Sequence, residues 1–169
     1  GARLADVDTA ASPVFAAQAA LAAAQVIVPC ESASVLQLDD RGLRFVAATG
    51  PVAARLIGRY IPSDAGAAGF AVQHRQVVVL YETKEDDRHL SVFDKETGYQ
   101  TQNLCCLPLL YEDQVFGVIE VINIPTGKPY DSSEIARLER VAWRLARRIK
   151  LGRPSQGDLS DPSLAPEDT

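Results

Sequence analysis

Three cysteines are the residues of this sequence that would most readily carry chemistry. Cys105 and Cys106 are adjacent in the apolar run LCCLPLL, and Cys30 lies far earlier in the chain. Such residues can form a redox pair, ligate a metal ion or pack as small hydrophobes. Because successive side chains of a strand point to opposite faces, Cys105 and Cys106 cannot both enter one pocket or hold one ion. We expect both to be core residues, one on each face of a sheet.

The two histidines could serve as ligands of a haem or a metal ion. His74 follows a short predicted helix, and His89 lies in the charged stretch KEDDRHL. A ligating histidine must point into a pocket and have a partner for its second ring nitrogen. Solvated loop positions are the simpler interpretation, so we expect no metal site and no cofactor. No Ser/His/Asp arrangement and no carboxylates spaced for acid–base catalysis stand out, so we expect no enzyme activity.

Composition restricts the class of protein. With 169 residues, 47% of them hydrophobic, the chain can build one domain with a single core. A formal charge of -5 disfavours nucleic acid as a partner. The longest apolar segment, 14–28, is too short to span a bilayer and contains Gln18 and Gln25, so we expect a buried helix and no membrane insertion. No signal peptide is apparent and three cysteines form no even disulfide framework, which favours a cytoplasmic location.

Local patterns predict an α+β fold built on an antiparallel sheet. Two of the connections between strands are tight hairpins, which a parallel βαβ array does not allow. The long segment between the third strand and the next is irregular and could cap a ligand. The expected helices lie at 13–28, within 51–62, within 65–76 and at 131–151, and the expected strands lie in the hairpin 35–47 and at 77–81, 104–112 and 114–123.

The same patterns set the expected boundaries. Residues 13–151 should form the domain, residues 1–12 an N-terminal extension, and residues 152–169 a tail or linker rich in proline, serine and acidic residues. Asp131 and Glu134 are spaced as a capping box at the start of the last helix.

Several motifs, in this order and spacing, resemble a GAF domain. They are the Gly66 and Gly69 pair, the segment DKETGY at 94–99, the strand LCCLPL, and GVIEVIN ending in Asn123. The resemblance covers roughly residues 13–149. It implies a sheet of about six antiparallel strands, with N- and C-terminal helices on one face and a loop and helix cap over a pocket on the other. GAF domains are sensory modules of phosphodiesterases, phytochromes, histidine kinases and transcriptional activators.

Two branches of the family match this sequence poorly. In the cyclic-nucleotide-binding branch, Asn123 and the aromatic Tyr130 fit the signature, but Ile124, Glu134 and Ile135 stand where lysine, aspartate and glutamate belong. Cyclic nucleotides therefore gain no support. A free methionine sulfoxide reductase also has a GAF-like fold, but its cysteine-rich loop is not recognisable here. A cysteine-dependent reductase remains a remote alternative to a non-enzymatic module.

The resemblance implies a pocket beneath the segment 82–103. We expect Phe93, Tyr99 and Thr101 to contact a small ligand, with Tyr81 and Cys105 at the floor, because an apolar floor with a few converging polar groups is typical of such sites. Asp94 is expected to brace the loop. Alternatively, the aromatic rings fill the space and leave a ligand-free scaffold.

The terminal helices predict a homodimer. The first helix is apolar nearly all round, and Val141 widens the apolar stripe of the last helix to which Leu145 belongs. We expect an interface that includes Phe15, Leu21, Val141 and Leu145, through which pocket occupancy would alter helix geometry. The alternatives are that both helices only bury against the sheet, or that the basic last helix binds a partner protein.

Overall fold

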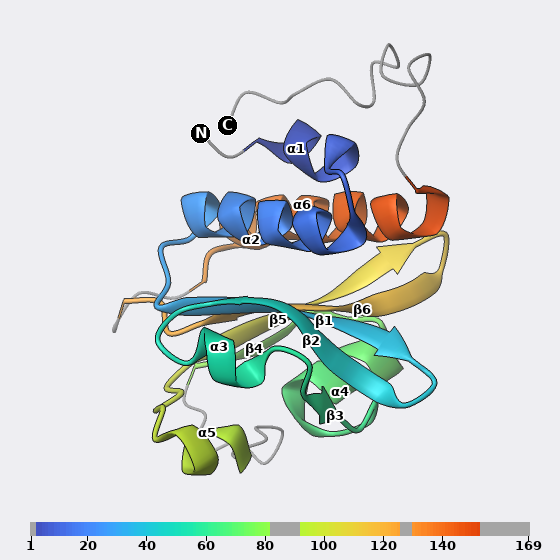
Figure 1. Ribbon diagram of the computed structural model, residues 1–169. Coiled ribbons are helices and arrows are strands. Elements are labelled where there is room, and N and C mark those ends of the chain that lie inside the picture. Colours follow the sequence, from blue (N-terminus) through green and yellow to red (C-terminus); the bar gives the residue numbers. More distant parts are fainter. Residues whose placement is uncertain (1–2, 82–91, 126–129, 153–169) are drawn as a thin grey trace.

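A six-stranded antiparallel sheet forms the middle layer of the protein in a computed structural model, which describes residues 3–81, 92–125 and 130–152 (Figure 1). The strand order is β3-β2-β1-β6-β5-β4. The α+β antiparallel architecture confirms the predicted fold class. The strands are β1 (Ser32–Asp39), β2 (Gly42–Thr49), β3 (Tyr60–Ile61), β4 (Val78–Leu80), β5 (Leu104–Tyr111) and β6 (Gln114–Ile122).

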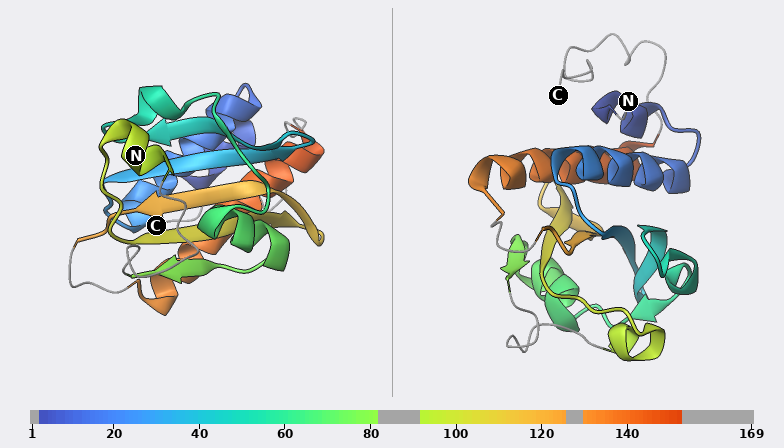
Figure 2. Two further views of the ribbon diagram at one scale, coloured as in Figure 1. Left: turned by 90° about the horizontal axis from the view of Figure 1, so that it is seen from below. Right: turned by 90° about the vertical axis from the view of Figure 1, so that its left-hand side faces the viewer.

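Helices cover both faces of the sheet. On one face α2 (Pro13–Ile27) and α6 (Ser132–Leu151) lie side by side, with α1 (Leu4–Thr9) outside them (Figures 1 and 2). The other face carries three short helices, namely α3 (Ala53–Leu56), α4 (Gly66–His74) and α5 (Val92–Thr97). Within the described residues, no helix is both long and apolar enough to cross a membrane.

The two long helices begin where local chemistry places them. Ser12 accepts a hydrogen bond from the backbone N–H of Phe15 at 3.1 Å, and Pro13 occupies the first position of α2. At the start of α6, the Asp131 carboxylate accepts from the Glu134 N–H at 2.7 Å, and the Glu134 carboxylate accepts from the Asp131 N–H at 3.3 Å. The predicted capping box is confirmed.

The alternation of β5 divides its side chains between two cores. Cys105, Leu107 and Leu109 pack in the cluster beneath α2 and α6, whereas Leu104 and Cys106 pack in the cluster on the opposite face. Both cysteines are fully buried. The prediction that they face opposite sides of the sheet as core residues is confirmed.

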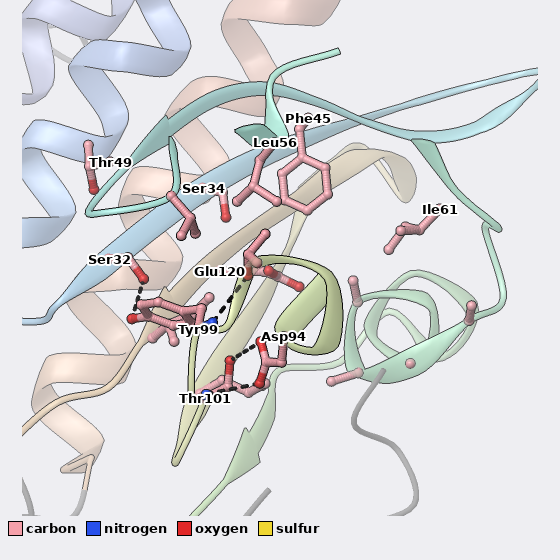
Figure 3. A pocket seen from close by; sticks show the side chains of 18 residues that line it. Ser32, Ser34, Phe45, Thr49, Leu56, Ile61, Asp94, Tyr99, Thr101 and Glu120 are labelled. Atoms are coloured by element: carbon pink, nitrogen blue, oxygen red, sulfur yellow. Dashed lines mark hydrogen bonds between the residues drawn. The ribbon is translucent and has the colours of Figure 1, made fainter. Parts of the chain in front are cut away.

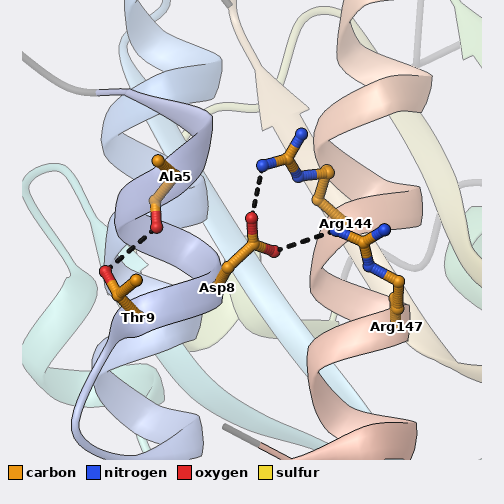
Figure 4. A network of polar contacts seen from close by, with 5 residues as sticks. All are labelled: Ala5, Asp8, Thr9, Arg144 and Arg147. Atoms are coloured by element: carbon orange, nitrogen blue, oxygen red, sulfur yellow. Dashed lines mark hydrogen bonds and ion pairs between the residues drawn. The ribbon is translucent and has the colours of Figure 1, made fainter. Parts of the chain in front are cut away.

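The segment that the sequence marked only as an extension contains α1, which packs on both α2 and α6. Leu4 and Val7 are buried there, and the buried Asp8 carboxylate pairs with Arg144 of α6 and, at 3.5 Å, with Arg147 (Figure 4). The chain therefore covers part of the outer surface of α2 and α6 with its own first helix.

The expected dimer residues are wrong in three of four positions. Leu21, Val141 and Leu145 are at most 1% exposed, because they pack into the core that α2 and α6 share with the sheet. The side chain of Phe15 is 57% exposed and remains available for contact. The sequence left open the alternative that both helices only bury against the sheet, and for these three residues the packing of α2 and α6 on the sheet decides in its favour.

Candidate functional site

A cavity of about 80 Å³ lies between the sheet and the layer formed by α3, α4 and α5 (Figure 3). Its apolar wall includes Phe45 of β2, Leu56 of α3 and Ile61 of β3, and Leu104 and Ile122 add to it from the central strands. Ala65, which precedes α4, and the first helix residues 66–68 close one side. The cavity thus draws on elements spread along most of the chain.

Gly69 lets α4 pack closely against the backbone of Asp64, just before the helix begins. A Cβ at this position would lie 2.4 Å from the carbonyl carbon of Asp64, a backbone atom that cannot move aside easily. The expected role of this glycine in a close backbone approach is confirmed.

The segment that follows α5 forms another wall and is braced by Asp94. The Asp94 carboxylate accepts hydrogen bonds from the Thr101 N–H at 2.9 Å and from the Thr101 hydroxyl at 3.0 Å. This confirms the bracing expected of Asp94. The end of α5 is held from outside by Arg55 of α3, which donates to the Glu96 carbonyl at 3.0 Å and to the Thr97 carbonyl at 3.4 Å.

Asn123, just after β6, fastens the same segment to the sheet. Its side-chain oxygen accepts from the N–H of Gln102 at 2.7 Å, and its amide group donates to the carbonyl of Gln100 at 2.9 Å and the hydroxyl of Tyr99 at 3.2 Å. The Tyr99 hydroxyl is also hydrogen-bonded to Ser32 at 2.9 Å. Asn123 therefore sets the position of the Tyr99 ring at the cavity wall.

Glu120 is the charged residue of the cavity floor (Figure 3). It pairs across the sheet with Ser34 of β1 on one side and Cys106 of β5 on the other. The Cys106 thiol donates to its carboxylate at 3.6 Å. The pKa of Glu120 is raised to about 7, chiefly by burial; the thiol contact opposes this increase and the charge of Asp94 adds to it. The floor thus holds a carboxyl group that changes its charge near neutral pH.

Comparison with protein families identifies the fold. The family model described as GAF domain matches residues 14–149. The chain belongs to the GAF family. Its fold is similar to that of the GAF domain of the Acinetobacter phosphoenolpyruvate-protein phosphotransferase, at 16% identity and a TM-score of 0.74, covering 90% of this chain and 93% of the other.

Two further proteins show the breadth of the family. The free methionine-R-sulfoxide reductase from Neisseria meningitidis, solved in complex with its substrate, is 18% identical with a TM-score of 0.70, covering 87% of this chain and 83% of that one. The cGMP-specific 3',5'-cyclic phosphodiesterase of Drosophila melanogaster is 35% identical over 68 residues. That match spans 40% of this chain and 6% of the phosphodiesterase.

The predicted contact residues of this GAF domain divide into three groups. Tyr99 and Thr101 line the cavity, as expected for contact positions. The side chain of Phe93 lies outside the part of the chain that the structure describes. Tyr81 is 56% exposed, and its ring centroid lies 6.4 Å from that of Tyr130 rather than at the floor.

The placement of Cys105 at the cavity floor is wrong. Strand alternation puts Cys106 on that face and turns Cys105 toward α2 and α6. Burial raises the pKa of Cys105 to about 12, and burial raises the pKa of Cys106 as well. Both sulfurs are therefore neutral thiols at physiological pH, the form that is a poor nucleophile.

The floor residues Glu120 and Ser34 were missed by the sequence reasoning. The signal was present in GVIEVIN, where Glu120 alternates with Val118 and Ile122, both of which face the cavity side of the sheet. Within the described residues, no group of three or more histidine, cysteine, aspartate or glutamate side chains could hold a metal ion. His74 is exposed and its ring stacks 4.1 Å from that of Phe70, and His89 lies outside the described residues.

Proposed function

We propose that this GAF domain is a non-enzymatic sensory or regulatory module that binds a small molecule in the cavity between the sheet and the helices α3, α4 and α5. The observation that carries the proposal is the lining of the cavity. Hydroxyl and carboxyl groups from β1, β6 and the segment after α5 converge on an otherwise apolar space. An apolar enclosure with a few polar groups is the usual composition of a small-molecule site.

The position of Tyr99 supports a ligand site rather than a filled scaffold. Its hydroxyl is held at the wall by Ser32 and Asn123, so the ring lines the cavity. A cavity of about 80 Å³ is smaller than the roughly 300–1,000 Å³ common for drug-sized ligands. We therefore expect the cavity to bind either a small metabolite or one part of a larger ligand.

The state of the cysteines supports a module without catalysis. A cysteine-dependent reductase requires a thiolate that a substrate can reach. Cys105 and Cys106 are fully buried, and burial raises the pKa of each thiol. The three cysteines are free, which is consistent with the cytoplasmic location that we propose.

We propose that the signal leaves the domain through α2 and α6 in a homodimer. These helices pack directly on β1, β2, β5 and β6, all four of which border the cavity on their other face. Of the interface residues expected from sequence, Phe15 is exposed and fits this role. Light scattering over a concentration series should give the mass of a dimer, and Phe15→Glu should shift it toward the monomer. A monomer mass for the unmodified chain at all concentrations would refute this route.

The ligand site is tested by filling the cavity. Ser34 is 2% exposed and lines the floor, so Ser34→Leu should occupy the space without disturbing the surface. Ser133→Leu, at an exposed position near the start of α6, is the matched control. A panel of nucleotides, amino acids and amines is screened by thermal shift.

We expect at least one compound to raise the Tm of the unmodified chain and of Ser133→Leu, but not of Ser34→Leu. If no compound binds, or if Ser34→Leu responds like the unmodified chain, the cavity is not the site. A scaffold that acts only through protein contacts would then be favoured.

A further inference from the structure

A row of three polar side chains crosses the middle of the otherwise apolar cavity floor. Cys106, Glu120 and Ser34 lie opposite one another on the adjacent strands β5, β6 and β1. The rows on either side are mainly apolar, with Leu104 and Ile122 on one side and Val118 on the other. A carboxylate on the central strand of the sheet is therefore surrounded by groups that do not compensate its charge.

The hydrogen bonding among the described residues leaves the charge of Glu120 poorly compensated. The donor to its carboxylate is a thiol at 3.6 Å, a weak donor at a long distance. Among the described residues, no arginine or lysine forms an ion pair with it. A carboxylate that is largely removed from water, as the half-buried Glu120 is, is costly unless a cation or strong donors approach it. A neutral or apolar residue at this strand position would avoid that cost.

Among the described residues, the charged side chains that line the cavity are acidic. The described residues that line it include the carboxylates of Glu120 and Asp94 and no lysine, arginine or histidine. Arg55 and Arg59 lie nearby but point to the outside of α5, where they contact the Glu96 carbonyl and carboxylate respectively. An anionic group on the floor would meet two acidic side chains, so the field favours a cation.

We propose that the ligand of this site is a small amine whose protonated nitrogen binds to the Glu120 carboxylate on the cavity floor. This inference rests on the proposed function of the cavity. A primary ammonium group carries three N–H donors. The Glu120 carboxylate takes the first of these, the hydroxyls of Ser34 and Thr101 accept from the others, and Asp94 adds its charge from the opposite wall. The apolar wall formed by Phe45, Leu56 and Ile61 then receives the carbon chain.

Three probes of equal length separate charge from shape. Butylammonium, butanol and butyrate are titrated at pH 7.5 into the isotopically labelled chain, and the backbone amide signals are followed by NMR. The same titrations are made with Glu120→Gln and with Glu139→Gln, which removes an exposed carboxylate on α6. The spectra also report whether each variant is folded.

We expect butylammonium to shift the amides of Thr101, Glu120 and Ile122, and to bind at least about tenfold more tightly than butanol, with butyrate inactive. Glu120→Gln should remove this preference, and Glu139→Gln should keep it. If butanol, butyrate or a nucleotide binds the cavity as well as the amine does, or Glu120→Gln keeps the preference, the amine inference fails while the ligand site stands. If no probe and no compound of the wider panel shifts these amides, the proposed function itself fails.

Discussion

Replacing Glu120 by glutamine should stabilise the unliganded protein at alkaline pH and change little in acid. Burial raises the pKa of Glu120 from an ordinary 4.5 to about 7, so between these values the folded state holds more protons than the unfolded state. Rising pH therefore lowers the free energy of unfolding through this group. The penalty is absent below about pH 4.5 and complete above about pH 7.

The size of the effect follows from the shift. An increase in the pKa of Glu120 from 4.5 to about 7 corresponds to a loss of about 3 kcal/mol in the free energy of unfolding, at about 1.4 kcal/mol for each pKa unit. Glu120 keeps some contact with solvent, so we expect a measured gain of about 2–3 kcal/mol for Glu120→Gln at pH 8.5. Near pH 4 the carboxyl is protonated and resembles the amide, so the two chains should be about equally stable.

Urea unfolding of the purified chains, followed by circular dichroism at pH 4 and pH 8.5, measures both values. Glu139→Gln serves as the control and should change stability little at either pH, because its side chain is exposed. Two results would refute the claim that Glu120 carries an uncompensated charge away from water. In the first, Glu120→Gln is less stable than the unmodified chain at pH 8.5. In the second, the two chains differ in stability by the same amount at both pH values.

Three other predictions concern packing. Gly69→Ala should lower the urea midpoint, with a loss of about 1–3 kcal/mol, since its Cβ would overlap backbone; an unchanged midpoint would contradict the close approach. Asp8→Ala should cost about 3–5 kcal/mol because it removes the carboxylate that pairs with the buried Arg144 guanidinium; full stability would show that this ion pair is dispensable. Half-buried Cys30 should react with a thiol reagent at least about tenfold faster than Cys105 and Cys106; rapid labelling of all three would contradict their burial.

The sequence predicts the fold well because its signals are local. The tight turn at Glu112 and Asp113 and the capping box at Asp131 each involve residues a few positions apart, and they correspond to the β5–β6 hairpin and the start of α6. The opposite orientation of Cys105 and Cys106 also follows from strand geometry alone. These features need no knowledge of what the strands pair with.

Which of the two cysteines faces the cavity does depend on contacts between residues far apart in the sequence. Which face of β5 borders the cavity is fixed by its register with β6, where Cys106 pairs with Glu120, and by the helices that cover each face. The same information identifies Glu120 as a floor residue. Similarly, the burial of Leu21 depends on the packing of α2 against α6 and the sheet. The helix α1, which covers part of α2 and α6, has six residues and no strong hydrophobic pattern in the sequence.

The central claim is that a small molecule binds in the cavity between the sheet and the helices α3, α4 and α5. The most direct measurement is the set of intermolecular NOEs between the panel compound that raises the Tm most and the methyl groups of the unmodified chain. We predict NOEs to Leu104, Ile122 and Ile61, whose side chains line the cavity. NOEs confined to methyl groups of α2 and α6, on the other face of the sheet, would contradict the claim.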